Sequence, residues 1–214
     1  MVSLLEKHGV EEAVVSPGSR NAPLMMALSA SGSIRCTVVI DERSAAFIAL
    51  GKASVTGRPV VLVCTSGTAL LNYAPAVAEA YYRKVSLIVV SADRPVEWID
   101  QDDSQTLRQY EALANYVKGN YNIPADCSAP TRQWYVNRMV NDALISATSG
   151  RQAPVHINVQ LDAPLGGMEG WNDTRWTART VGIIQPDQRL SHADAASPVS
   201  YTHLRAHETV LDLV

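Results

Sequence analysis

The sequence lacks the features that would assign it to several large classes of protein. Its 214 residues carry a formal net charge of −3, which gives no electrostatic case for binding nucleic acid or an anionic membrane. No apolar run approaches the roughly 20 residues of a membrane-spanning helix. The first eight residues are amphipathic and include an acid, unlike a secretory signal peptide.

Cysteine is scarce. Only Cys36, Cys64 and Cys127 occur, and their spacing matches no metal-binding or redox motif. Cys36 and Cys64 lie in or beside apolar runs, as buried thiols do. Reduced thiols are typical of a cytoplasmic protein, and this is the location we expect.

Two phosphate-binding motifs are also missing. Residues 65–69 (Thr-Ser-Gly-Thr-Ala) follow an apolar run, but no Gly-Lys-Ser/Thr follows them as in a P-loop. The G-x-G-x-x-G fingerprint of dinucleotide-binding folds is absent as well. We therefore do not expect a common nucleotide-phosphate site.

What is present is an alternation of short apolar runs with amphipathic segments. It predicts an α/β fold with a doubly wound, mainly parallel six-stranded sheet and helices on both faces. We place this domain at residues 1–165, with a linker and the start of a missing central domain at 166–197. Strands are expected at residues 13–16, 37–41, 60–64, 85–91, 116–123 and 154–159, and helices at about 2–8, 21–30, 43–55, 68–82, 105–115 and 131–148.

Polar turns follow four of the expected strands, at residues 16–20, 41–43, 65–68 and 93–95. Parallel strands end at one edge of a sheet, so these turns should lie together where ligands bind in such folds. Glu42 follows an apolar β-branched run that reads as a buried strand, and is our candidate for the chemical centre. Taken singly, however, each turn is also compatible with helix capping or with solvated charges.

Simpler interpretations stay open for several residues. Asp93 and Arg94 could form a local ion pair, and Gln105, Arg108 and Gln109 could face water at a helix start. His156, inside an apolar strand, is more simply a hydrogen-bonded structural residue than a ligand. Trp134 is expected to face inward from the helix at 131–148, and Asn72 has nothing there to cap.

Together the motifs resemble one family. Ser-Pro-Gly-Ser-Arg (16–20), Asp-Glu-Arg-Ser (41–44), Thr-Ser-Gly-Thr-Ala-x-x-Asn (65–72) and Ser-Ala-Asp-Arg-Pro (91–95) occur in order. This order resembles the pyrimidine-binding domain of thiamine-diphosphate enzymes. Within these it is most similar to the 2-succinyl-5-enolpyruvyl-6-hydroxy-3-cyclohexene-1-carboxylate synthase family of menaquinone biosynthesis. Pro-Val-His-Ile-Asn-Val at 154–159 also fits, so the resemblance covers residues 2–165.

The resemblance implies a transferase that joins 2-oxoglutarate, with loss of carbon dioxide, to isochorismate. It implies thiamine diphosphate and Mg²⁺ or Mn²⁺ as cofactors, in a homodimer or a higher homo-oligomer. Glu42 matches the family's catalytic glutamate, which hydrogen-bonds the aminopyrimidine ring, and burial would favour its protonated form. The other implied cofactor contacts are Thr65, Ser66, Gly67, Thr68 and Asn72, and the implied substrate contacts are Ser19, Arg20, Arg94 and Gln105.

The sequence also departs from the family. Nothing matches the Gly-Asp-Gly segment with which the family's C-terminal domain holds metal and diphosphate, so the chain itself should hold no metal. We expect an N-terminal fragment, with a truncated first helix, that is inactive alone. Residues 198–214 resemble translated sequencing-adapter DNA and are expected to be a non-native tail. Residues 100–104 are more acidic than the resemblance predicts.

Two other functions stay open. An acetolactate-synthase relative would have Thr-Ser-Gly-Pro-Gly where this chain has Thr-Ser-Gly-Thr-Ala at residues 65–69. A non-catalytic flavodoxin-like module could bind a partner or a nucleotide through the same edge of the sheet.

Overall fold

The computed structural model describes residues 1–163, 165 and 178–181. They form a six-stranded sheet in the order β2-β1-β3-β4-β6-β5, in which every pair of neighbours is parallel. The expected fold class is therefore confirmed. The expected tail at 198–214, and all but residues 178–181 of the expected linker, lie outside the described residues. Among the helices that are described, none is both long and apolar enough to cross a membrane.

The two central strands are buried along their whole length. Val61 and Val63 pack on one face of the sheet, whereas Leu62 and Cys64 pack on the other, because side chains alternate along a strand. This explains why the sequence shows continuous apolar runs there. The strands are β1 (Glu12–Val15), β2 (Arg35–Val38), β3 (Val60–Cys64), β4 (Leu87–Asp93), β5 (Asn120–Ile123) and β6 (Val155–Gln160).

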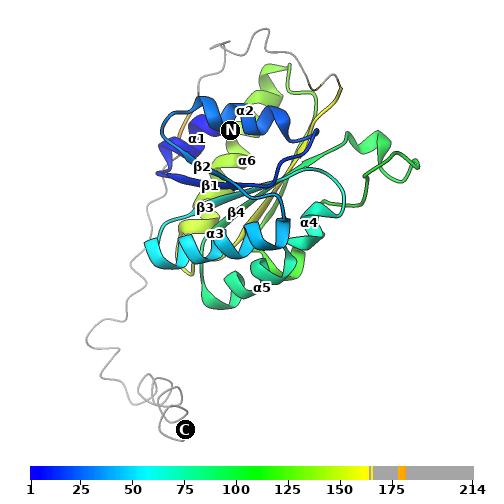
Figure 1. The fold of residues 1–214 in the computed structure, drawn as a ribbon. Helices are drawn as coiled ribbons and strands as arrows, with labels where there is room; N and C mark the ends of the chain where they lie inside the picture. The colour runs from blue at the N-terminus through cyan, green and yellow to red at the C-terminus, as the bar shows by residue number, and fades with distance from the viewer. Residues whose placement is uncertain (164, 166–177, 182–214) are drawn as a thin grey trace, which may run out of the picture. The chain divides into compact units, whose positions relative to one another are not determined.

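Helices cover both faces of the sheet (Figure 1). One face is covered by α1 (Val2–Lys7), α2 (Ala22–Ala30) and α6 (Pro130–Thr148), and the other by α3 (Glu42–Thr56), α4 (Ala69–Asn72) and α5 (Ala74–Arg83). Two short 3-10 turns, η1 (Val96–Trp98) and η2 (Ala114–Tyr116), lie in the connection from β4 to β5. In Figure 1 this connection extends beyond the carboxyl edge of the sheet.

The strand before Glu42 differs from the prediction. β2 ends at Val38, pairs only with β1 and is not buried, because it is the edge strand of the sheet. The chain leaves the sheet after Val39, and the side chain of Ile40 is 82% exposed. Glu42 is therefore the first residue of a helix rather than the tip of a buried strand.

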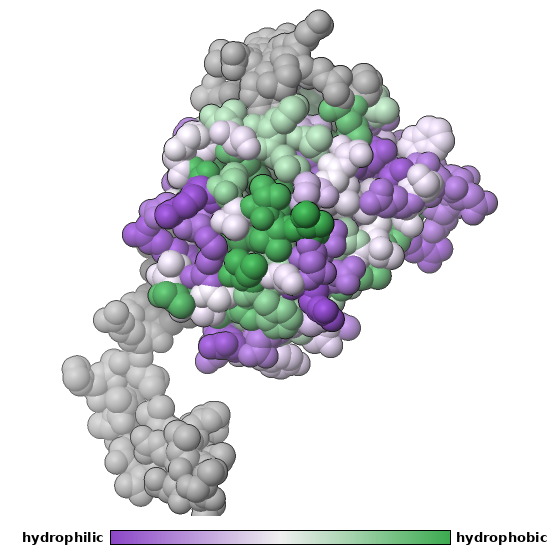
Figure 2. All heavy atoms as spheres, viewed as in Figure 1, coloured by the Kyte–Doolittle hydropathy of each residue, from purple (hydrophilic) through white to green (hydrophobic). Residues whose placement is uncertain are grey.

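An apolar surface remains over this edge, which we call the α3 face. The green area in the middle of Figure 2 lies over α3 and the connection from β2. The apolar residues that form the α3 face are each between 40% and 88% exposed, whereas an ordinary monomer keeps exposed apolar patches small. The α3 face comprises Val38, Ile40, Phe47, Ile48 and Val55.

Two helix predictions were wrong in part. The helix expected at 68–82 is broken at Tyr73 into α4 and α5, because Pro75 has no N–H with which to continue the first helix. The helix expected at 105–115 does not form. Gln105 and Glu111 have φ of 57° and 65°, which no right-handed helix allows, and only η2 follows.

Trp134 does not face inward as predicted. It is 62% exposed, although Met139 and Leu144 of the same helix are buried as expected. Helical residues advance about 100° each, so Trp134 lies roughly opposite the face centred between Met139 and Leu144. The prediction of a helix at residues 131–148 was therefore correct, but Trp134 in its first turns was wrongly assigned to the buried face.

Candidate active site

The first and third polar turns pack against each other at the carboxyl edge. A Cβ built on Gly18 would lie only 2.4 Å from the Cβ of Thr65, so only glycine allows this approach. The buried hydroxyl of Tyr73 donates to the carbonyl of Val63 at 2.7 Å, and its oxygen lies 3.2 Å from Oγ of Ser16, within hydrogen-bond distance. These bonds fix the ends of β1 and β3 together, and with them residues 16–20 and 65–68.

Gln109 connects residues 65–68 to the two neighbouring strands. Its Oε1 accepts the Gly67 N–H at 2.6 Å, and its Nε2 donates to the Ala92 carbonyl at 3.0 Å and to Oδ1 of Asn158 at 3.1 Å. Only 1% of Gln109 is exposed, so the interpretation that it faces water was wrong. No local pattern marks it, since these partners lie 17 to 49 residues away.

A buried polar network continues from Asn158 beneath the site. Its Nδ2 donates to Asp93, and its Oδ1 accepts the Ser91 hydroxyl at 2.8 Å. Because that hydroxyl is already donated, Ser91 Oγ must accept from Nε2 of His156, which lies 2.7 Å away. Nδ1 of His156 is then a buried acceptor without a partner, and burial lowers the pKa of His156 to about 4. The prediction of a structural histidine is confirmed.

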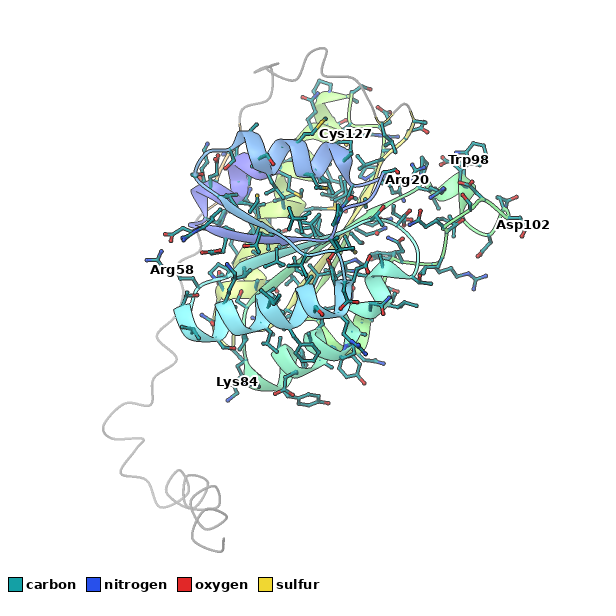
Figure 3. The ribbon with its side chains drawn as sticks, in the orientation of Figure 1. Arg20, Arg58, Lys84, Trp98, Asp102 and Cys127 are labelled. Carbon is teal, nitrogen blue, oxygen red and sulfur yellow. The ribbon has the colours of Figure 1, made fainter. Side chains whose placement is uncertain are left out.

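Two arginines converge on a cavity of about 210 Å³ at this edge. Arg94 Nη1 donates to Oγ of Ser66 at 3.1 Å and to the Gln105 carbonyl at 3.4 Å, while Arg20 Nη1 donates to the Leu161 carbonyl at 2.6 Å. Burial lowers the pKa of Arg20, and the positive charge of Arg94 lowers it further. Two partly buried guanidinium groups that repel each other favour an anion between them. Figure 3 shows Arg20 at the base of the extended connection.

The local ion pair proposed for Asp93 and Arg94 does not form. Arg94 pairs through Nε with Asp103 instead. The Asp93 carboxylate accepts the backbone N–H of Arg94 at 2.8 Å, and burial raises the pKa of Asp93. Asp93 therefore belongs to the buried network, and the Arg94 guanidinium is directed to the cavity side.

Glu42 lies at the same edge and is half-buried. The exposed Asp41 caps α3 by accepting the Ser44 N–H at 2.8 Å, as the helix-start interpretation predicts. Burial raises the pKa of the Cys64 thiol and of the Tyr73 hydroxyl, and the charge of Glu42 raises both further. The Glu42 carboxylate is therefore close to the end of β3.

The remaining predicted site residues are at the surface. Asn72 is exposed and its Nδ2 donates to the Thr68 carbonyl at 3.1 Å, a bond within its own helix that caps neither end, in line with the expectation that Asn72 has nothing there to cap. Ser19 and Thr68 are exposed, and Gln105 contributes its carbonyl rather than its side chain to Arg94. The part of the chain that the structure describes contains no group of three or more acidic, His or Cys side chains able to hold a metal.

The sequence that builds this site matches the model of a known family. Residues 1–112 match the family model described as thiamine pyrophosphate enzyme, N-terminal TPP binding domain. Since the match covers more than half of the 214 residues, the chain belongs to this family.

Its curated relatives include enzymes that carry one name, 2-succinyl-5-enolpyruvyl-6-hydroxy-3-cyclohexene-1-carboxylate synthase. The Porphyromonas gingivalis protein is 50% identical over 167 residues, which are 78% of this chain and 29% of the relative. The Cytophaga hutchinsonii protein is 51% identical over 161 residues, or 75% and 29% of the two chains. The Phocaeicola vulgatus protein is 44% identical over 197 residues, or 91% and 34%. The chain spans about a third of the length of these relatives.

Proposed function

We propose that this chain supplies the pyrimidine-binding part of a thiamine-diphosphate-dependent transferase that joins decarboxylated 2-oxoglutarate to isochorismate. The observation that carries the substrate class is the convergence of Arg20 and Arg94 on one cavity beside residues 65–68. Both substrates carry two carboxylates, and guanidinium groups bind carboxylates through paired hydrogen bonds. The names of the relatives favour this reaction over an acetolactate-synthase activity or a flavodoxin-like binding role.

The residues of the edge fit the cofactor's ring. Oγ1 of Thr65 is buried without a hydrogen-bond partner, so it is free to bind a polar group of a ligand. Glu42 offers a half-buried carboxylate at the same edge. When bound, thiamine diphosphate supplies a stabilised carbanion for the carbon–carbon bond. We assign Glu42 the task of holding a proton against a ring nitrogen of the cofactor.

The residues described here do not fit the metal. They contain no suitable cluster, and no Gly-Asp-Gly occurs in the sequence. We infer that Mg²⁺ or Mn²⁺ and the diphosphate bind to a further domain, for which the longer relatives have room.

We also propose that the protein forms a homodimer in which a second copy covers the α3 face. We propose a cytoplasmic location as well, which the free thiols of Cys36, Cys64 and Cys127 favour.

A domain exchange tests the proposal. Residues 1–165 would replace the matching segment of the Porphyromonas gingivalis synthase, and product formation from 2-oxoglutarate and isochorismate would be followed with thiamine diphosphate and Mg²⁺. We expect this chimera to be active and the 214-residue chain alone to be inactive. Glu42→Gln in the chimera should lower kcat by about 100-fold or more, the effect of losing a proton-transferring group.

Asp41→Asn is the matched control, because it removes a neighbouring charge and Asn is an equally good helix cap. It should leave kcat within about twofold of the unsubstituted chimera, a change of less than about 0.5 kcal/mol in the barrier. Retention of full activity by the Glu42→Gln chimera would contradict the role given to Glu42. Turnover by the isolated chain would contradict the need for a further domain.

A further inference from the structure

Arg94 is already paired with a carboxylate of its own chain. Its Nε donates to Oδ2 of Asp103, and the Arg94 side chain is only 10% exposed. Asp103 lines the same cavity as Arg20. The hydrogen bond from Arg94 and the charges of both arginines lower the pKa of Asp103, so it is ionised at neutral pH. A negative charge of the protein thus stands where a substrate carboxylate would bind.

The remaining bonds of Arg94 limit how a second carboxylate could bind. Nη1 is engaged by Ser66 Oγ and the Gln105 carbonyl, so Asp103 takes the Nε–H that a paired carboxylate contact would use. Two carboxylates at one guanidinium repel each other. A carboxylate can therefore form a paired contact with Arg94 only by displacing Asp103, and one that also reaches Arg20 gains a further contact for doing so.

We propose that Asp103 is a specificity-determining residue, an internal carboxylate that occupies Arg94 until a dicarboxylate bridging Arg94 and Arg20 displaces it. The identification of that dicarboxylate as a substrate rests on the function proposed above. A monocarboxylate, which has no second carboxylate with which to bind Arg20 while the first displaces Asp103, is held off by the competition. One of the acids in residues 100–104, Asp103, thus has a function in an anion-binding site.

The backbone around Asp103 is suited to displacement. Asp100, Asp102 and Gln105 have φ between 57° and 62°, a left-handed region that residues with a Cβ seldom adopt. The other ion pair of the loop, between Arg108 and Asp100 at 2.7 Å, is exposed. Figure 3 shows Trp98 and Asp102 on a segment that extends away from the sheet.

The test measures carboxylate binding to the full 214-residue chain. The Arg94 Nε–H signal of ¹⁵N-labelled protein would be followed by NMR during titration with 2-oxoglutarate and, separately, with acetate. Asp103→Asn removes the internal charge and should bind 2-oxoglutarate at least about fivefold more tightly, which corresponds to about 1 kcal/mol. Its preference for 2-oxoglutarate over acetate should fall. Asp103→Ala, which leaves no amide to bond Arg94, should behave alike.

Asp102→Asn is the matched control. This substitution removes the same charge from the residue immediately before Asp103, and Asp102 has no ion pair among the described residues. Asn also tolerates the left-handed backbone conformation of Asp102. It should bind within about twofold of the unsubstituted chain, which is under about 0.5 kcal/mol. Equal binding by the Asp103 and Asp102 variants would overturn the proposal, as would an Arg94 signal that no carboxylate moves. The activity of the chimera judges the proposed function separately in either case.

Discussion

Lowering the pH from 7 to 5 should cost the folded protein about 2 kcal/mol through His156 alone. The side chain is fully buried, and burial lowers its pKa to about 4, compared with about 6.5 in an unfolded chain. Between these values the unfolded chain binds a proton that the folded chain does not. The stability that neutral His156 confers is therefore fully present above about pH 6.5 and is lost as the pH falls toward 4.

The magnitude follows from the difference between the two pKa values. A pKa difference of one corresponds to about 1.4 kcal/mol. The difference of about 2.5 between the unfolded and folded pKa of His156 therefore stabilises the folded chain by roughly 3 kcal/mol at neutral pH, and about 2 kcal/mol of this stabilisation is lost by pH 5. The hydrogen bonds give the physical reason. Ser91 commits its hydrogen to Asn158, so His156 donates from Nε2, and a second proton on Nδ1 would be a buried donor without an acceptor.

Urea denaturation followed by far-UV circular dichroism at pH 7, 6 and 5 measures the effect. Gln does not titrate in this range. The free energy of unfolding should therefore fall less between pH 7 and pH 5 for His156→Gln than for the unsubstituted chain, and the difference between the two chains isolates the contribution of His156. If the unsubstituted chain and His156→Gln lose the same stability between pH 7 and 5, within about 0.5 kcal/mol, the reasoning is refuted.

Two further predictions concern the turn at residues 65–68. Gln109→Ala should destabilise the chain by about 2 kcal/mol or more in the same urea assay, because it leaves the Gly67 N–H and groups of the buried network unpaired; a loss below about 0.5 kcal/mol would contradict this. Gly67→Ala should lower Tm, because Gly67 has a φ of 83° and its added Cβ would lie 3.0 Å from the Gln105 carbonyl oxygen. Gly51→Ala, in open space within α3, should instead stabilise by about 1 kcal/mol, and a Tm change of the same sign in both variants would refute the assignment of strain.

Much of the fold could be predicted from the sequence because its signals are local. The run at residues 60–64 is apolar and β-branched throughout, as a strand covered on both faces must be, and β3 has these bounds. Alternation of such runs with helices implies parallel strands, and parallel strands bring their following turns to one edge. Residues 16–20 and 65–68 were therefore predicted to meet, and Gly18 does lie against Thr65.

Segments without periodicity depend on distant contacts and could not be predicted. Gln109 lies in a stretch that propensity assigns to a solvent-facing helix, yet it is buried, with hydrogen-bond partners in the turn after β3, in β4 and in β6. Trp134 and Ile40 show the opposite case, apolar residues that this chain leaves exposed. A single sequence does not show which of its apolar side chains another part of the protein covers.

The sequence by itself determined the class of fold, the edge of the sheet where chemistry is possible and the residues that resemble a thiamine-diphosphate site. Their order along the chain carries that information, since each motif follows its own strand. Only the tertiary structure decided the environment of each charge: that Glu42 begins a helix beside an edge strand, that Asp93 is buried with Asn158, and that Arg94 pairs with Asp103. Hydrogen bonds and ion pairs act over a few ångströms, and the fold brings residues within that distance regardless of their separation in the chain.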